Sequence, residues 1–199
     1  MTNLCRIVTL WLIVFVSVPS SARPKDVPGS QGTRWGMSET ALLNVFGSKL
    51  KKLPARQAFV WLHVDYVITD FAIDGNSYTV FFQMDDRSNK LSQVLIRLNE
   101  METHTPRLEE FNRLERLLTT EFGVPEKSDH NFLGPSSNYR SIEQRRTWKF
   151  HTSTIEFYYG WDDQIYASLL SIRYFPTEHP PPRHRTNRWT GARVACFST

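Results

Sequence analysis

The sequence predicts an α+β fold in which two helices pack on one face of an antiparallel sheet of about six strands. Three observations lead to this prediction. Runs rich in aromatic and β-branched residues predict strands, and two segments with apolar residues at helical spacing predict helices. The order of one helix followed by three strands then occurs twice along the chain. We therefore predict two similar αβββ halves that share one sheet.

The chain begins with the pattern of a secretory signal peptide. Residues 1–22 contain a short polar start with Arg6, the apolar run IVTLWLIVFVSV and the small-residue exit PSSA. This pattern predicts cleavage after Ala22, and the apolar run is shorter than the ~20 residues that cross a bilayer. We expect a mature protein that is secreted or periplasmic. A retained membrane anchor is the alternative.

Cysteine content and charge place further bounds on the mature chain. Cys5 lies in the signal peptide and Cys196 close to the C-terminus, so no intrachain disulfide and no cysteine-based metal or redox motif is expected. With 40% apolar and 13% aromatic residues, the chain can form a single domain held by its own core. The net charge of +4 comes from the tail, because acidic and basic residues nearly balance between 34 and 177.

Composition also divides the chain. Residues 23–33 (RPKDVPGSQGT) lack apolar periodicity and predict a flexible lead-in, and residues 34–175 form the predicted single domain. Residues 176–199 are rich in proline and arginine and predict a disordered tail. The tail combines arginines with Trp189, a composition that suits weak contact with an anionic surface; no nucleic acid partner is expected.

The first half of the domain opens with the segment WGMSETALLNVFG (35–47), which has an apolar stripe, a serine at its start and a glycine at its end, and so predicts a helix. Strands follow at 60–73 and 77–84, joined by Asp74-Gly75-Asn76, a strong hairpin signal. A third strand is predicted at 91–98.

The second half repeats this order. The segment PRLEEFNRLERLLTTEFGVP (106–125) has leucines and a phenylalanine at helical spacing and ends at a glycine followed by a proline, which predicts a helix. After a predicted long polar loop at 126–144, strands are predicted at 147–150, 154–161 and 168–175. We predict that these three are the counterparts of the first three strands.

Matching positions support an internal duplication. Alignment of the halves places Phe71 on Trp148, the pair Asp85-Asp86 on Asp162-Asp163, and Ile96 on Ile172. The alternative is that two antiparallel meanders resemble one another by composition alone. In both halves the alternation along the strands leaves one apolar face, which we predict to lie beneath the helices.

The other face of the predicted sheet carries the candidate binding residues. They combine aromatic and arginine side chains, which favour protein interfaces, and are Phe81, Gln83, Arg97, Tyr158 and Arg173. The sequence contains nothing that forms a third layer over this face. We therefore predict that it contacts a partner.

Two other groups of residues suggest chemistry. Asp85 and Asp86 are adjacent, so on a strand they point to opposite faces, and the stretch DDRSNK predicts a hairpin turn. His63 and Asp65 share a face of a strand, but two ligands do not make a zinc site, and we interpret them as a polar patch on the open face. No catalytic, metal or cofactor motif is present.

The opening GMSETALLNVFG (36–47) resembles the start of SmpA/OmlA (BamE-like) outer-membrane lipoprotein domains. The duplicated arrangement of a helix and a meander is similar to that of the secreted β-lactamase inhibitory protein. The resemblance implies a small helix-and-sheet module that binds another protein and catalyses no reaction. The chain departs from both families, since it has no lipobox and no cysteine pairs of the inhibitor kind.

The leading prediction is thus a secreted or periplasmic, non-enzymatic protein-binding module without cofactor or metal, whose partner is another extracytoplasmic protein or envelope component. One alternative is an extracytoplasmic hydrolase that acts from the 126–144 loop together with His63 and Asp65. The other is a homo-oligomeric structural protein.

Overall fold

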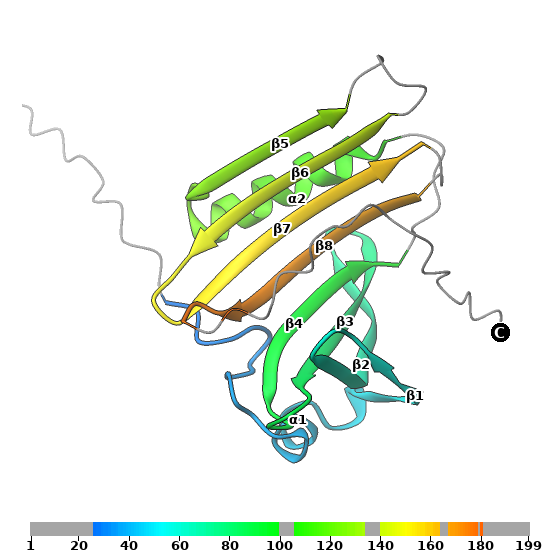
Figure 1. Ribbon diagram of the computed structural model, residues 1–199, viewed down its shortest axis with the longest axis vertical. Helices are drawn as coiled ribbons and strands as arrows, with labels where there is room; N and C mark the ends of the chain where they lie inside the picture. Colours follow the sequence, from blue (N-terminus) through cyan, green and yellow to red (C-terminus); the bar gives the residue numbers. More distant parts are fainter. Residues whose placement is uncertain (1–25, 100–105, 134–139, 164–166, 179, 181–199) are drawn as a thin grey trace, which may run out of the picture.

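The computed structural model describes residues 26–99, 106–133, 140–163, 167–178 and 180. They form one eight-stranded antiparallel sheet with two helices (Figure 1). The structure is 52% strand and 19% helix. The predicted α+β fold, with a sheet of about six strands and two helices on one face, is therefore wrong, because the molecule is mostly one eight-stranded antiparallel sheet with only two short helices. The predicted signal peptide (1–22) and nearly all of the predicted tail lie outside the described residues.

Each half of the chain contains one helix followed by four strands. The first half runs α1 (Glu39–Phe46), a 3₁₀ helix (Gly47–Lys49), β1 (Lys51–Ala58), β2 (Leu62–Ile73), β3 (Asn76–Asp85) and β4 (Leu91–Leu98). The second half runs α2 (Leu108–Phe122), β5 (Lys127–Leu133), β6 (Ser141–Lys149), β7 (Ser153–Asp162) and β8 (Ala167–Pro176).

The two strands that the sequence did not predict are β1 and β5. The order of the sheet is β1-β2-β3-β4-β8-β7-β6-β5, so both are edge strands. The residues of β1, KKLPARQA, are almost all exposed and include Pro54, and β5 has the polar sequence KSDHNFL. An edge strand buries little and needs no apolar alternation. For this reason the predicted αβββ unit is wrong, and so is the part of the predicted 126–144 loop that forms β5.

The two halves meet where β4 pairs with β8, with Ile96 opposite Ile172. The pairing registers correspond on either side of this seam. Tyr78 of β3 lies opposite Leu98 of β4, and Ile155 of β7 lies opposite Tyr174 of β8. Because β4 pairs directly with β8, the sheet runs through the seam without interruption (Figure 1).

One apolar cluster fills the space between the sheet and the helices. In the first half Phe46 of α1 contacts Phe82 at a centroid distance of 4.9 Å. In the second half Phe111 of α2 stacks on Phe157 at 4.6 Å with an interplanar angle of 8°. Both contacts belong to the same continuous core, which includes side chains from α1, α2 and the central strands. Neither helix is long and apolar enough to cross a membrane.

The side of the sheet away from the helices is here called the second face. Strand β2 bends on this side, since its pairing with β3 shifts register twice and Asp70 adopts a φ of 58°. A small cluster of Val64, Val67 and Phe81 forms on the second face, with Leu53, Phe59 and Leu95 packed against it. This cluster fixes the β1–β2 end of the face.

The segment before α1 packs against the β6–β7 turn. The hydroxyl of Ser153 donates to the carbonyl of Val27 and accepts a hydrogen bond from Nε1 of Trp35 at 2.8 Å. The backbone N–H of Thr152 donates to Asp26 Oδ1 at 3.0 Å. Asp26 and Val27 therefore contact the folded domain, and both lie in the 23–33 stretch that the sequence predicts to be a flexible lead-in.

Candidate functional site

The pairing registers place the polar side chains of the second face in rows that run across the strands. One row holds Arg97 of β4, Ser171 of β8, Tyr158 of β7 and Arg145 of β6, each opposite the next. The adjacent row holds Leu95, Arg173, Glu156 and Thr147 on the same four strands. Three arginines are therefore brought onto one small area by strands from both halves of the chain.

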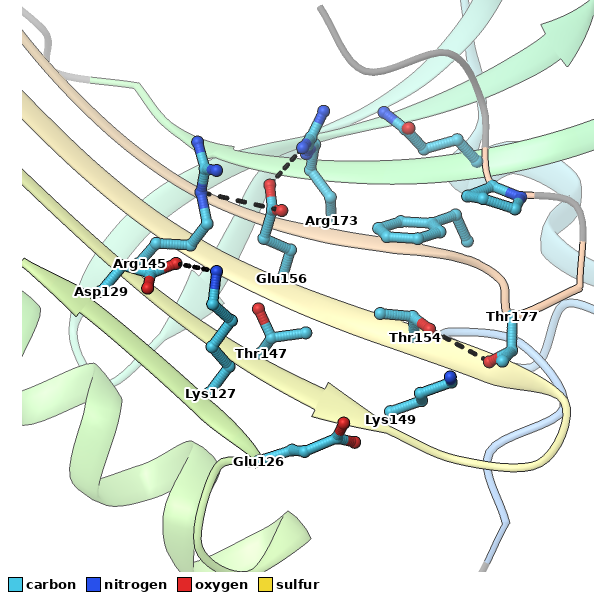
Figure 2. A pocket seen from close by; sticks show the side chains of 13 residues that line it. Glu126, Lys127, Asp129, Arg145, Thr147, Lys149, Thr154, Glu156, Arg173 and Thr177 are labelled. Atoms are coloured by element: carbon cyan, nitrogen blue, oxygen red, sulfur yellow. Dashed lines mark hydrogen bonds and ion pairs between the residues drawn. The ribbon is translucent and has the colours of Figure 1, made fainter.

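A buried carboxylate lies between two of these arginines. The side chain of Glu156 is only 4% exposed. Its Oε1 accepts a hydrogen bond from Arg173, and its Oε2 lies 3.7 Å from Nε of Arg145 (Figure 2). The bond to Arg173 is the closer of the two. Nε of Arg145 is itself buried and has no hydrogen-bond partner in the described part of the chain.

Two of the arginines are held against aromatic rings. The guanidinium carbon of Arg145 lies 5.5 Å from the ring centre of Tyr158, and that of Arg97 lies 4.9 Å from the ring centre of Phe81. Burial lowers the pKa of Arg97. Among the described residues, Arg97 forms no ion pair and no side-chain hydrogen bond. An aromatic ring beneath a guanidinium orients its plane and leaves its edge N–H groups available.

The ring of Tyr158 is fixed by its neighbours on the same face. Its hydroxyl donates to Glu143 Oε1 at 3.3 Å, and burial raises its pKa. A Cβ placed on Gly160 would lie 2.6 Å from the Tyr158 hydroxyl, so the glycine provides the space that this ring occupies. This arrangement holds the ring beneath Arg145.

A groove of about 460 Å³ opens beside these residues (Figure 2). Arg145, Glu156 and Arg173 form one side of it, and Gln93, Thr154 and Phe175 line it further along the sheet. Lys127 and Lys149 from β5 and β6 also line the groove. Lys127 pairs with Asp129 at 2.8 Å. The groove is thus lined by charged side chains of both signs, by uncharged polar side chains and by the aromatic ring of Phe175.

The five predicted binding residues have different places in this arrangement. Arg97 and Arg173 belong to the rows that carry the site, and Tyr158 lies in one of these rows but is only 7% exposed and supports Arg145. Phe81 is 6% exposed and supports Arg97 from below, and Gln83 is 2% exposed and accepts a hydrogen bond from Gln93. These last two stabilise the face and are not accessible for contact with a partner.

Sequence reasoning missed Arg145. It lies between the loop predicted at 126–144 and the strand predicted at 147–150, whereas in the structure β6 begins at Ser141. The signal that could have located it is the alternation of Glu143, Arg145 and Thr147 with the residues between them. This alternation is difficult to recognise in the sequence because the intervening Arg146 is charged although it is buried.

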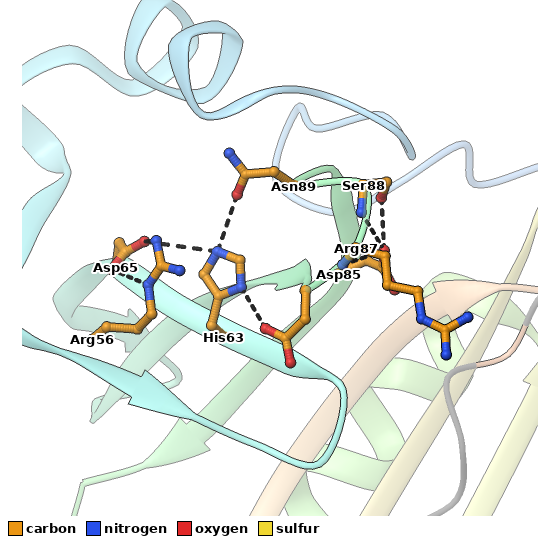
Figure 3. Close-up of polar contacts among 8 residues, drawn as sticks. Arg56, His63, Asp65, Asp85, Arg87, Ser88 and Asn89 are labelled. Carbon is orange, nitrogen blue, oxygen red and sulfur yellow. Dashed lines mark hydrogen bonds and ion pairs between the residues drawn. The ribbon is translucent and has the colours of Figure 1, made fainter.

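A second polar cluster surrounds His63 at the other end of the sheet (Figure 3). The imidazole is 3% exposed, with Nδ1 2.7 Å from Asp86 Oδ1 and Nε2 3.1 Å from Asn89 Oδ1. Asp65 lies 3.7 Å from Nε2 and is held by two hydrogen bonds from Arg56. This cluster joins β1, β2 and the β3–β4 turn. His63 is therefore buried, and its interpretation as part of an open polar patch is wrong.

The adjacent aspartates of the β3–β4 turn have separate roles. Asp85 Oδ1 accepts hydrogen bonds from the backbone N–H groups of Arg87 and Ser88 and from the Ser88 hydroxyl. These bonds, chiefly those from Ser88, lower the pKa of Asp85. The predicted hairpin turn is confirmed, and Asp86 additionally fixes His63. Within the described ranges, no group of three or more potential ligands could hold a metal ion.

The residues of the hydrolase alternative lie far apart. His63 and Asp65 are on β2, and the stretch 126–144 forms β5 and the start of β6, with residues 134–139 outside the described ranges. In the sheet, β3, β4, β8 and β7 lie between β2 and β6. The two parts of that predicted active site are therefore not brought together.

Comparisons with protein-family models, with curated proteins and with solved structures find no match to this chain.

Proposed function

We propose that this protein is a secreted or periplasmic, non-enzymatic binding module that holds another extracytoplasmic protein on the second face of its sheet. The observation that carries the proposal is the groove lined by Arg145 and Arg173, with Arg97 on β4 of the same face. Aromatic rings orient Arg145 and Arg97, and arginine is among the residue types that dominate protein interfaces. The binding role also agrees with the resemblance to BamE-like domains.

The chemistry of the groove supports binding over catalysis. Both carboxylate oxygens of Glu156 face arginine side chains, since Oε1 accepts a hydrogen bond from Arg173 and Oε2 lies 3.7 Å from Nε of Arg145. The hydroxyls of Thr154 and Thr177 bond to one another at 3.0 Å, and Thr177 also donates to the carbonyl of Phe150. These groups are engaged in fixing the walls of the groove.

The similar order of elements in the two halves of the chain suggests how the second face originated. We propose that a unit of one helix and four strands was duplicated, and that the second face took residues from both copies. The equivalent registers of the β3–β4 and β7–β8 pairs support this proposal.

Filling the groove tests the binding role. Thr147 is half-buried on β6 and lines the groove without taking part in its ion pairs, so Thr147→Trp adds bulk there and leaves Glu156 and its arginines in place. Asn112→Trp on the exposed side of α2 is the matched control, since it adds the same ring away from the second face.

The measurement is affinity capture from the native envelope or medium, with residues 23–199 as bait and mass spectrometry as readout. We expect one partner to be captured by the wild type and by the Asn112→Trp variant, and to be lost with Thr147→Trp. Equal capture by all three would contradict the proposal. A dimeric or larger mass of the purified wild type that Thr147→Trp reduces to a monomer would instead favour the homo-oligomer.

A further inference from the structure

We infer that the second face recognises an acidic segment of its protein partner, with carboxylates bound by Arg97 and Arg145. This inference rests on the proposed function and adds the chemical class of the ligand.

Arg97 provides the first part of the argument. Its side chain is half-buried on β4 and lies over Phe81, and no described acid or hydrogen-bond acceptor engages it. A guanidinium withdrawn from water without a partner lowers stability, since the charged form loses hydration and gains little in return. The free protein is therefore less stable with Arg97 than it would be with an apolar side chain. A bound carboxylate that accepts hydrogen bonds from the Arg97 guanidinium explains why an arginine is present there.

Arg145 provides the second part. It shares Glu156 with Arg173, which hydrogen-bonds to that carboxylate, whereas Nε of Arg145 lies 3.7 Å from it and the Arg145 side chain is 29% exposed. The ring of Tyr158 keeps its guanidinium in place. One acid therefore serves two arginines, and Arg145 retains capacity for a further carboxylate.

The spacing of the two arginines indicates an extended segment. Arg97 and Arg145 lie in one row, on β4 and β6, with β8 and β7 between them. Neighbouring strands are ~4.8 Å apart, so the two Cα atoms are separated by roughly 14 Å. In an extended chain, side chains four residues apart project to the same side and are separated by about 13 Å. Two acidic residues with three residues between them would thus reach both arginines.

The groups between and around the arginines agree with such a segment. Ser171 and Tyr158, which separate them, are uncharged, and the Tyr158 hydroxyl already donates to Glu143. Lys127 and Lys149 line the adjoining groove and favour negative charge, whereas Glu126 and Asp129 in the groove and the nearby Glu143 oppose it. The half-buried Arg97 is less accessible to a lipid surface than an exposed cation would be.

The test uses a synthetic peptide of alternating Glu and Thr, which presents acids at the required spacing, and a matched peptide of alternating Gln and Thr. Binding to the mature protein is measured by calorimetry at low and at high salt. We expect the acidic peptide alone to bind, with an affinity that falls as salt is added. In Arg97→Met and in Arg145→Met the affinity should fall by about tenfold, whereas Arg116→Met, on the exposed side of α2, should bind as the wild type does.

Thermal unfolding of each variant accompanies the binding measurement. Arg97→Met should be at least as stable as the wild type, because it removes an unpaired and partly buried charge. Equal affinity for both peptides, or unchanged affinity in both arginine variants, would overturn the inference. Stronger binding to inorganic phosphate or to phosphatidylglycerol vesicles than to the acidic peptide would also overturn it. Loss of the partner in Thr147→Trp together with unaltered peptide binding in Arg97→Met would reject the acidic ligand and retain the binding function.

Discussion

Gly160 shows how one residue determines the geometry of the second face. The Tyr158 ring lies above it, supports Arg145 and reaches Glu143 through its hydroxyl. A glycine in the middle of a strand ordinarily weakens the strand, because it has no side chain to pack. Here the missing side chain is the space that the Tyr158 ring occupies.

Gly160→Ala should therefore displace the Tyr158 ring, since the added Cβ would lie 2.6 Å from its hydroxyl. We expect a loss of about 1 kcal/mol in the free energy of unfolding as the bond to Glu143 breaks. Burial raises the pKa of Tyr158 in the folded protein. An absorbance titration should then show one more tyrosine ionising near its ordinary pKa of about 10 in the variant. An identical titration curve would mean that the ring has not moved.

Asp85 gives a prediction for acid pH. Its pKa is lowered in the folded state, so its stabilising contribution is present above its ordinary pKa of about 3.9 and is lost as the pH falls through the folded value. Asp85→Ala should reduce stability by about 1 kcal/mol at neutral pH and by much less under strong acid. Asp85→Asn keeps an acceptor oxygen in the turn and serves as the control. Urea unfolding at both pH values measures the difference, and a loss that is the same at both would be inconsistent with this role.

The sequence predicted that Asp85 belongs to a turn, but it did not predict that Asp86 contacts His63. The turn chemistry of DDRSNK is local and can be recognised in the sequence. The contact between Asp86 and His63 depends on how the β3–β4 turn meets β2, where the strand pairing changes register. Local pattern does not determine the position of such an irregularity. The same limit explains why the burial of Phe81 and Gln83 was not predicted.

At the scale of elements, α2 is attached to β6 by a pair of charged residues. Arg146 is 6% exposed on its side chain and donates to both carboxylate oxygens of Glu115, and its guanidinium lies 5.1 Å from the ring centre of Phe111. The pair fixes the position of the helix on the strand that carries Arg145. The helix thus helps to orient the second face from the opposite side of the sheet.

Glu115→Ala should lower the free energy of unfolding by about 2 kcal/mol, because it leaves a buried guanidinium without its carboxylate. Glu121→Ala, at an exposed position on the same helix, should change it by less than about 0.5 kcal/mol. Guanidinium chloride would screen the ion pair, so the comparison requires urea. A similar small effect of both substitutions would show that the pair does not fix α2.

The helices and the apolar central strands were predictable because their patterns follow from burial on one side. The edge strands β1 and β5 were not predictable from the sequence. An edge strand pairs with one neighbouring strand through its backbone and buries few side chains, so its sequence needs no apolar pattern. Arg145 was missed for a different reason, because the buried face of its strand contains the charged Arg146.

At the scale of the whole molecule, the two halves share one core and one sheet. The apolar cluster continues across the β4–β8 seam, where Ile96 faces Ile172. A module divided into two independent domains could move its arginines apart. A continuous core instead holds Arg97 of one half and Arg145 of the other in a fixed relation, which preorganised binding requires.

Ile172→Ala should therefore weaken both halves together. Its side chain is 2% exposed, so truncation is expected to cost about 3 kcal/mol. Thermal unfolding followed by circular dichroism and by tryptophan fluorescence should show one coincident transition in the wild type and in the variant. Two separate transitions would show that the halves unfold independently.

If the second face of the sheet binds an acidic segment of a partner, an amide NMR titration of the mature protein with the peptide of alternating Glu and Thr should locate the contact. We expect the largest chemical-shift changes on β4, β8, β7 and β6 around Arg97, Ser171, Tyr158 and Arg145. Changes confined to the helices or to the His63 cluster, or no saturable change, would contradict it.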